Sequence, residues 1–237
     1  MSKNKGTLFL IPNVIADGTA EAMIAPQVRD IVKNTSYYLV ENLRTARRYI
    51  SSLKLGLTIE ALELEVLDKK TKDAALAQLM KPVMDGRDVG IISESGCPGI
   101  ADPGALAVEY AHKHGIRVIP LVGPSSLFMA LMSSGFSGQH FAFSGYLPID
   151  KKRRIDAIKK LELTAREKYQ TQIFMETPYR NDHLFADLVK TCSANVKLCI
   201  AKDVSGQDEM IMTKTIAEWK KVKLSIGKFP TIFVLSA

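Results

Sequence analysis

The sequence of 237 residues has no long apolar run, and none of its hydrophobic stretches approaches the ~20 residues that a membrane-spanning helix needs. Its start, Met1–Asn4, leads directly into the strand-like segment Thr7–Pro12 and lacks the apolar stretch and the cleavage site of a secretory signal. The three cysteines, Cys97, Cys192 and Cys199, are odd in number and far apart, which argues against a disulfide framework and against a cysteine metal site. We therefore expect no membrane segment, no bound metal and a reducing, cytoplasmic location.

Negative charge is in the minority, because 25 Asp and Glu residues stand against 32 Lys and Arg, and the formal net charge is +7. A basic balance favours polyanionic partners, since binding to phosphates releases condensed counterions. Three clusters carry much of the positive charge: Arg44, Arg47 and Arg48; the run Lys151–Arg154; and Lys220, Lys221 and Lys223. Solvated helix faces and nucleic-acid binding explain these clusters equally well, and both interpretations stay open.

Strand-like segments alternate with helix-like ones along most of the chain. The expected strands are Thr7–Pro12, Tyr37–Glu41, Leu62–Val66, Val89–Ser93, Val118–Val122, Phe141–Leu147, Gln172–Glu176, Leu198–Asp203, Met210–Thr213 and Thr231–Leu235. The expected helices are Arg44–Leu53, Lys72–Met84, Gly104–His114, Ser125–Ser133, Arg153–Glu167 and Arg180–Thr191. This alternation predicts a mainly parallel first sheet, and short connections near the C-terminus predict a mixed second sheet. Ten strands are too many for one open sheet in a chain of this length. The expected fold class is therefore α/β with two α/β domains, residues 1–123 and 124–237.

The loop Ser93–Gly104 follows an expected strand and is rich in glycine, proline and small residues. Such a loop brings backbone groups close to a ligand without side-chain obstruction. It matches neither the phosphate-binding P-loop nor the G-x-G-x-x-G dinucleotide fingerprint, and its Asp102-Pro103 pair is also an ordinary helix start. Three further loops follow strands in the same way: Val122–Ser126, Glu176–Arg180 and Ala201–Ser205. Ligands collect at the carboxyl ends of parallel strands, so the four loops together indicate a cleft between the two domains.

Four ordered motifs carry a family resemblance. Val89–Gly104 reads V-G-I-I-S-E-S-G-C-P-G-I-A-D-P-G and resembles a motif of the tetrapyrrole methylase superfamily. It is similar in particular to the branch that methylates a cytidine 2′-hydroxyl in small-subunit ribosomal RNA, whose pattern is S-D-A-G-T-P-G-I-S-D-P-G. Val118–Ser126, Phe174–Arg180 and Ala201–Ser205 are similar, in the same order, to its V-P-L-P-G-P-S-A, F-Y-E-S-P-H-R and A-R-E-L-T motifs.

The resemblance implies an S-adenosylmethionine-dependent methyltransferase in which two α/β domains enclose the cofactor, usually as a homodimer, in a fold that is not Rossmann-like. The expected partner is ribosomal RNA or the small ribosomal subunit. The first domain would hold the acceptor and the G-C-P-G cofactor loop, and the second would complete the cofactor site. Carried over by position, the expected cofactor-binding residues are Pro12, Ser93, Gly96, Cys97, Pro98, Ile100, Ser125, Ser126, Met175, Glu176, Ala201 and Lys202.

The sequence also departs from this branch, mostly in the first domain. Asn13–Gly18 stands where the family has T-P-I-G-N, and Asn42 replaces the aspartate of A-E-D-T-R. Leu67–Thr71 replaces a polar H-x-H-N-E stretch. The family's extra C-terminal segment is missing from this sequence, which we interpret as a short form of the enzyme.

Three functions are compatible with these patterns: methylation of RNA, which we favour; methylation of a tetrapyrrole or another small molecule; and binding of RNA or cofactor without turnover. A ribose hydroxyl needs a nearby proton acceptor, and the candidates at strand ends are Glu41 and Glu94. Either carboxylate is explained equally well as a surface group or as a partner for Arg44. If the acceptor is RNA, we expect phosphate contacts from Arg44, Arg47 and Arg48 and from Lys151–Arg154.

Overall fold

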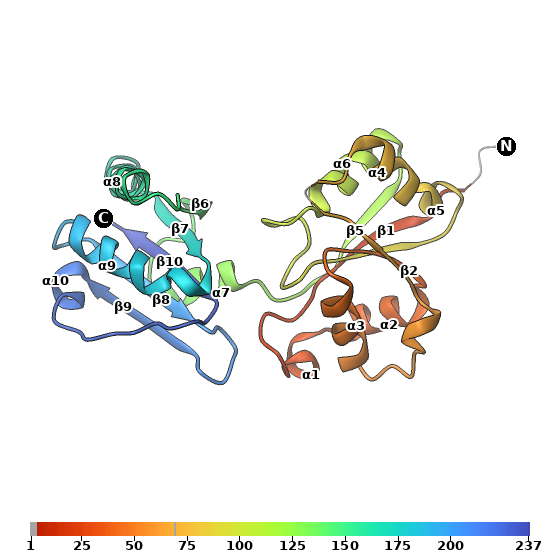
Figure 1. Cartoon of the computed structure of the whole chain (residues 1–237), viewed down its shortest axis with the longest axis horizontal. Helices are drawn as coiled ribbons and strands as arrows, with labels where there is room; N and C mark the ends of the chain where they lie inside the picture. The colour runs from red at the N-terminus through yellow and green to blue at the C-terminus, as the bar shows by residue number, and fades with distance from the viewer. Residues whose placement is uncertain (1–3, 69) are drawn as a thin grey trace. The chain divides into compact units, whose positions relative to one another are not determined.

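The computed structural model describes residues 4–68 and 70–237 and divides into two compact units, Met1–Ser125 and Ser126–Ala237 (Figure 1). Residues 1–3, and Lys69 of the Leu67–Thr71 stretch, lie outside the described residues. All ten predicted strands are present within two residues of their predicted ends. Among the described helices, none combines the length and the apolar character that crossing a membrane requires.

The first unit contains a five-stranded parallel sheet in the order β3-β2-β4-β1-β5. The strands are β1 (Thr7–Ile11), β2 (Tyr37–Val40), β3 (Glu63–Val66), β4 (Val89–Ile92) and β5 (Arg117–Pro120). Strands β2 and β4 are buried along their whole length, as expected for a parallel sheet with helices on both faces. This sheet confirms the predicted parallel arrangement.

Helices cover both faces of this sheet (Figure 1). One side carries α1 (Ala20–Met23), α2 (Pro26–Asn34) and α3 (Leu43–Ser52), and the other carries α4 (Asp73–Leu79), α5 (Lys81–Met84) and α6 (Gly104–Lys113); the short 3-10 helix η1 (Ile59–Ala61) precedes β3. Because side chains alternate across a strand, Tyr38 and Val40 enter one core while Tyr37 and Leu39 enter the other.

The helices of the first unit differ from the prediction, which also lacked the short α1 and η1. Helix α2 was not predicted, although Pro26 at its first position and the buried pair Val28 and Val32 are typical of an amphipathic helix. The single helix expected over Lys72–Met84 is divided into α4 and α5. The division precedes Pro82, whose ring cannot donate a backbone hydrogen bond and crowds the preceding turn.

The second unit contains a mixed sheet in the order β6-β7-β10-β8-β9. Its strands are β6 (Phe141–Tyr146), β7 (Thr171–Glu176), β8 (Lys197–Lys202), β9 (Met210–Thr215) and β10 (Thr231–Ser236). Only the β6–β7 pair is parallel, and β10 pairs antiparallel with both β7 and β8. The mixed second sheet is therefore confirmed.

Helices also lie on both faces of this second sheet (Figure 1). The main core fills one face, where α8 (Lys151–Lys168), α9 (Asn181–Thr191) and α10 (Ile216–Trp219) pack over Phe174, Ile200 and Phe233. Helix α7 (Ser126–Ser134) contacts β8, β9 and β10, and the 3-10 helix η2 (Pro178–Arg180) joins β7 to α9. Since strand residues alternate between faces, Met175, Ala201 and Ile232 lie on the α7 face.

A buried ion pair ties α8 to α9. Arg154 donates from Nε and Nη2 to one carboxylate oxygen of Asp187, at 2.8 and 2.7 Å, and from Nη1 to the carbonyl of Ile149. The side chains of Arg154 and Asp187 are only 8% and 11% exposed. The predicted phosphate contact of Arg154 is therefore wrong, because its guanidinium is buried and already engaged.

We predict that Arg154→Ala destabilises the second unit by about 3–5 kcal/mol, because the carboxylate of Asp187 stays buried without its partner. Urea unfolding followed by fluorescence measures this directly, since the chain's single tryptophan, Trp219, lies in the core of this unit. The neighbouring Arg153→Ala, on an exposed side chain, is the matched control and should change stability by no more than about 0.5 kcal/mol. Equal unfolding midpoints for the two variants would contradict the assigned role of the ion pair.

Candidate functional site

Three loops of the first unit meet at the carboxyl edge of its sheet. They follow the neighbouring strands β1, β4 and β5, whose carboxyl ends share one edge because the strands are parallel. The backbone N–H of Asn13 donates to the carbonyl of Gly96 at 2.8 Å, and the Sγ of Cys97 lies 3.4 Å from the carbonyl oxygen of Pro124. A Cβ added to Gly123 would come within 2.1 Å of Pro12, so these loops approach as closely as a glycine allows. The structure thus brings the predicted residues Pro12, Gly96 and Cys97 together.

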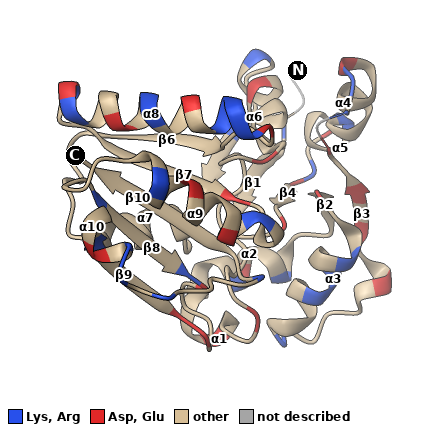
Figure 2. Cartoon of the chain, turned by 60° about the vertical axis from the view of Figure 1, so that its left-hand side comes forward, with Lys and Arg blue, Asp and Glu red and all other residues tan. Residues whose placement is uncertain are grey.

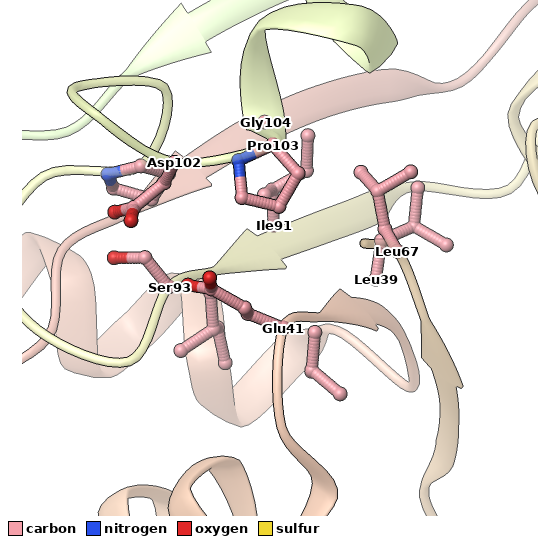
Figure 3. A pocket seen from close by; sticks show the side chains of 11 residues that line it. Leu39, Glu41, Leu67, Ile91, Ser93, Asp102, Pro103 and Gly104 are labelled. Atoms are coloured by element: carbon pink, nitrogen blue, oxygen red, sulfur yellow. The ribbon is translucent and has the colours of Figure 1, made fainter. Parts of the chain in front are cut away.

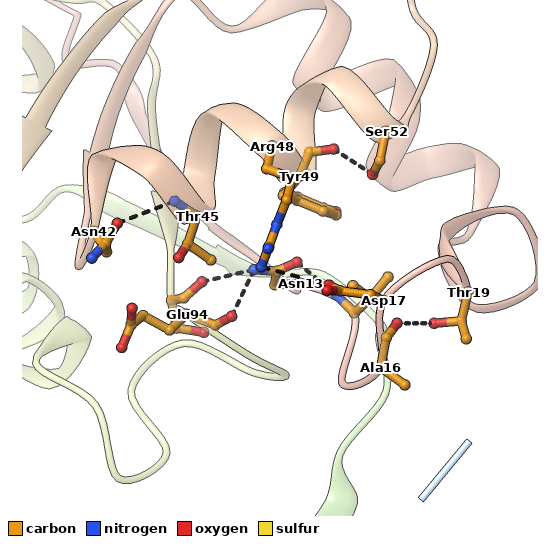
Figure 4. A network of polar contacts seen from close by, with 12 residues as sticks. Asn13, Ala16, Asp17, Thr19, Asn42, Thr45, Arg48, Tyr49, Ser52 and Glu94 are labelled. Carbon is orange, nitrogen blue, oxygen red and sulfur yellow. Dashed lines mark hydrogen bonds and ion pairs between the residues drawn. The ribbon is translucent and has the colours of Figure 1, made fainter. Parts of the chain in front are cut away.

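Asn13 fixes the relative position of two of these loops (Figure 4). Its side chain is buried, and Nδ2 donates to the carbonyls of Ser93 and Glu94, each at 3.0 Å, while Oδ1 accepts from the N–H of Val14. A buried amide is stabilising only when its donors and acceptor are paired, as they are here. In the sequence, Asn13 is distinguished only as part of a departure from the family pattern. The signal for its role was a polar amide placed directly after a buried strand.

Tyr49 of α3 attaches the loop after β1 to that helix. Its hydroxyl donates to the carbonyl of Pro12 at 2.6 Å from the buried face of α3. Burial raises the pKa of Tyr49, so the phenol stays neutral and keeps its donor at physiological pH. The loop after β1 is therefore attached both to the β4 loop and to α3.

The loop after β4, Ser93–Gly104, consists mostly of small residues, so its surface is formed largely by backbone atoms. Gly96 has φ +66°, in the left-handed region that favours glycine, and its carbonyl lies between Asn13 and the hydroxyl of Ser93. The Ser93 hydroxyl also donates to the carbonyl of Ser95 at 3.1 Å, within the loop itself. Pro98 is buried, whereas Ile100 is 50% exposed and forms the apolar outer side of the loop.

A small cavity opens beside this loop, between the ends of β2 and β4 and the start of α6 (Figure 3). Glu41, Ser93 and Asp102 lie on one side of it, and Leu39 and Leu67 form the other side. Its volume is about 10 Å³, which is about the minimum for one water molecule. The cavity is therefore a small notch at the strand ends, polar on one side only, rather than a complete ligand site.

The two residues proposed as proton acceptors, Glu41 and Glu94, contact each other through the backbone of Glu94. Oε2 of Glu41 accepts from the backbone N–H of Glu94 at 3.4 Å, so Glu41 contacts the β4 loop directly. Glu94 is exposed and Glu41 is half-buried. In the described part of the chain Glu41 forms no ion pair with Arg44, so the structural role considered for it is not seen.

Asn42, the departure from the family's aspartate, has a clear local role. Its side-chain oxygen accepts from the N–H groups of Arg44 and Thr45 and caps α3 (Figure 4). Asparagine and aspartate cap helices about equally well, so this substitution preserves the fold of the segment. The helix then exposes Arg44, Arg47 and Arg48; Arg48 has a loose, exposed ion pair with Asp17 at 3.6 Å.

The second unit carries the remaining predicted residues on its own strand ends. Met175 and Ala201 both pair with Ile232 of β10 and so share the α7 face, and Ser126 begins α7. Glu176 and Lys202 both pair with Thr231 and lie on the opposite face. The predicted residues of this unit therefore fall into two groups on opposite faces of the sheet.

Glu176 and Lys202 have structural partners. Oε1 of Glu176, whose side chain is fully buried, accepts from Nη2 of Arg180 and from the N–H of Thr177, both at 2.6 Å. The ammonium of Lys202 lies 4.4 Å from the ring centre of Phe229. Four buried polar atoms near these strand ends have no hydrogen-bond partner among the described residues: Glu176 Oε2, Arg180 Nε, Asn181 Oδ1 and Ser205 Oγ.

Similar proteins are found by sequence and by structure, although no family model matches the chain. The chain is 28% identical over 229 residues to ribosomal RNA small subunit methyltransferase I of Halalkalibacterium halodurans, covering 95% of this chain and 75% of that protein. It is 29% identical over 238 residues to the protein of the same name in Buchnera aphidicola, covering 99% of this chain and 79% of that protein. Crystal structures of the methyltransferase CobJ and of uroporphyrin-III-C-methyltransferase from Thermus thermophilus match 98% of the chain, with TM-scores of 0.62 and 0.57 at 17% and 16% identity.

The matched regions cover 94% of the CobJ chain and 92% of the uroporphyrin-III-C-methyltransferase chain, so the likeness extends over both units. The chain resembles ribosomal RNA small subunit methyltransferase I in sequence and has the fold of the two crystal structures. The predicted resemblance and the predicted fold class are thereby confirmed. All four proteins are named as methyltransferases, which agrees with the predicted enzyme class and with S-adenosylmethionine as its cofactor.

We predict that iodoacetamide labels the native protein slowly and at Cys97 alone. Cys97 is half-buried, whereas Cys192 and Cys199 are buried, and burial raises the pKa of Cys192 to about 12. Burial also raises the pKa of Cys97, so at pH 8 it holds less reactive thiolate than an unperturbed cysteine, and labelling should accelerate as pH rises. Peptide mass spectrometry of the labelled protein is the measurement, with Cys97→Ser as the control. Labelling at pH 8 faster than that of a model cysteine peptide would contradict the described environment.

Proposed function

We propose that this protein is an S-adenosylmethionine-dependent methyltransferase that acts on ribosomal RNA, with a cytidine 2′-hydroxyl as the acceptor. The observation that carries the proposal is the glycine loop after β4, held in place by Asn13 and by the loop after β5. That loop belongs to a chain that is similar over nearly its whole length to ribosomal RNA small subunit methyltransferase I.

The residues present fit the cofactor. Gly96 and its neighbours form a loop of small residues, fixed by internal hydrogen bonds and with the exposed apolar side chain of Ile100 on its outer side, which suits close packing against a flat adenine. In the first unit we assign cofactor contacts to Pro12, Ser93, Gly96, Cys97, Pro98, Ile100 and Ser125, and in the second to Ser126, Met175 and Ala201. Glu176 and Lys202, also predicted as contacts, have partners of their own and lie on the other face, so we assign them a supporting role.

When bound, the cofactor supplies a methyl group on a positively charged sulfur. The chain's own contribution is mainly positioning, because methyl transfer needs the acceptor oxygen held in line with that group. The three joined loops provide a rigid frame for this purpose, since their hydrogen bonds connect β1, β4 and β5. We propose Glu41 as the acceptor for the hydroxyl proton, ahead of Glu94, because Glu41 lines the notch and contacts the β4 loop.

An RNA acceptor is supported by charge as well as by similarity. The net charge of +7 and the exposed arginines of α3 suit a polyanion, and each phosphate contact to a single strand contributes roughly 0.7 to the salt slope of binding. We further infer a homodimer and a cytoplasmic location, in keeping with the resemblance and with a ribosomal substrate. A tetrapyrrole or other small acceptor is the second candidate, favoured by the fold of the two matching crystal structures.

We predict that Gly96→Val abolishes cofactor binding and the transfer of labelled methyl groups to small ribosomal subunits. A branched side chain at this left-handed position strains the loop, and its Cβ would lie 3.4 Å from both Ile15 and the carbonyl oxygen of Pro124, so the joined loops would shift. Calorimetry with S-adenosylmethionine and S-adenosylhomocysteine measures binding, and counting the label in purified ribosomal RNA measures transfer. The matched control is Gly56→Val, because Gly56 also has a positive φ, +71°, in open space outside the loop.

Normal cofactor binding by Gly96→Val would mean that the loop only begins a helix. If the wild-type protein binds the cofactor but transfers label to a small molecule and never to ribosomal subunits, the RNA assignment fails and the second candidate replaces it.

A further inference from the structure

Two exposed tyrosines lie at the carboxyl ends of the parallel strands β6 and β7 in the second unit. Tyr146 ends β6 and is 54% exposed, and Tyr179, in η2 just after β7, is 76% exposed. Strand β6 is in register with β7 through the pair Tyr146 and Met175, so both tyrosines belong to one end of this strand pair. Large aromatic side chains exposed together are uncommon on a protein surface and point to a binding role.

Positive charge is interleaved with these rings. The ammonium of Lys228 lies 5.1 Å from the ring centre of Tyr179. Arg180 follows Tyr179 in η2, and the pKa of its guanidinium is raised, first by the hydrogen bond to Glu176 and to a smaller extent by Tyr146. We call Tyr146, Tyr179, Arg180 and Lys228 the β6–β7 patch.

The basic start of α8 follows β6 after only four residues. Lys151, Lys152 and Arg153 are exposed there, and within the described residues none of the three forms an ion pair. Figure 2 shows lysine and arginine along α8. Cations therefore continue along the chain from the patch into α8.

Buried hydrogen bonds hold the patch in shape. The side chain of Asn181 donates to the carbonyls of Gly227 and Phe229, at 3.2 and 2.7 Å, on either side of Lys228. Asp182 accepts from the N–H of Ile226 at 2.6 Å, and Glu176 holds Arg180. The loop that carries Lys228 and the turn that carries Tyr179 are thus fixed to α9, which lowers the entropy cost of binding a ligand.

We propose that the β6–β7 patch is a stacking surface for an unpaired base of the RNA substrate, with Lys228 and the start of α8 contacting the flanking phosphates. Aromatic rings interleaved with cations are the recurring means of binding single-stranded RNA, because every base has a face that stacks. The inference rests on the proposed function, and it specifies that the substrate is unpaired at the point of contact.

The test uses the full chain and an RNA oligonucleotide of about 12 nucleotides that carries the fluorescent base 2-aminopurine, as a single strand and as a duplex. The single strand should bind more tightly than the duplex, with quenched fluorescence. Tyr179→Ala should weaken single-strand binding roughly 5- to 100-fold and remove the quenching, because base stacking on one ring is worth about that much. Tyr179→Phe should keep both, since its ring is retained.

Two matched controls isolate the patch. Tyr169→Ala removes a tyrosine that is 84% exposed at the end of α8, outside the patch, and should leave binding unchanged. Lys228→Ala should reduce the salt slope by roughly 0.7, the contribution of one single-strand phosphate contact. Lys197→Ala, which removes a lysine at the opposite end of β8 from Lys202, should leave the salt slope unchanged.

The inference is overturned if Tyr179→Ala binds and quenches like the wild type, or if Tyr179→Phe loses as much as Tyr179→Ala. It is also overturned if Tyr179→Ala loses affinity for S-adenosylmethionine by calorimetry, because the stacked base is then the adenine of the cofactor. In each of these cases, if the wild-type protein still transfers methyl groups to ribosomal subunits, the proposed function stands and only the stacking surface is rejected. Absence of both cofactor binding and transfer in the wild type would reject the proposed function itself.

Discussion

The buried amide of Asn13 is the interaction on which the first unit's candidate site depends. It joins the end of β1 to the loop after β4 through two carbonyls, and the Asn13 backbone N–H adds a third bond to Gly96. An unpaired amide at this depth would cost roughly 1–3 kcal/mol, so the pairing strongly favours one arrangement of the two loops. Glycine at position 123 then allows the loop after β5 to contact Pro12. Asn13 and Gly123 are therefore enough to hold the loops after β1, β4 and β5 in one rigid arrangement.

This frame explains why the departures from the family pattern do not disturb the fold. Asn42 caps α3 with the geometry expected of the aspartate it replaces, and Asn13 provides its own connection where the family has a different sequence. Both residues preserve the strand ends, and Asn42 also changes the chemistry there, since its neutral amide replaces an aspartate that carries charge. The chain therefore keeps the backbone frame to which we assign cofactor binding, and we expect any difference from its relatives in how the acceptor is recognised.

Much of the fold could be predicted from the sequence, because its signals are local. Hydrophobic segments separated by glycine and proline marked every strand, and the change from alternating helices to short turns marked the mixed second sheet. Helix α2 was missed because its apolar stripe is short and its few buried residues are spread among polar ones. The break before Pro82 could have been anticipated, since proline lacks a backbone N–H and its ring crowds the preceding turn of a helix.

The candidate site was less predictable, because its contacts are long-range. Nothing local distinguishes Arg154 from Arg153, yet one is buried against Asp187 and the other is exposed. The opposite faces of Met175 and Glu176 follow from strand alternation, but which face each side chain occupies depends on pairing with β10. Motif similarity located the loops correctly in the sequence. Only the structure distinguishes the residues that line a surface from those that support it.

Mapping the methylated nucleosides of small-subunit ribosomal RNA by mass spectrometry tests the central claim most directly. The RNA would be taken from cells that lack this gene and from the same cells with the gene restored. The account predicts that one 2′-O-methylcytidine is lost without the gene and returns with it. Identical nucleoside profiles in the two RNAs would contradict it.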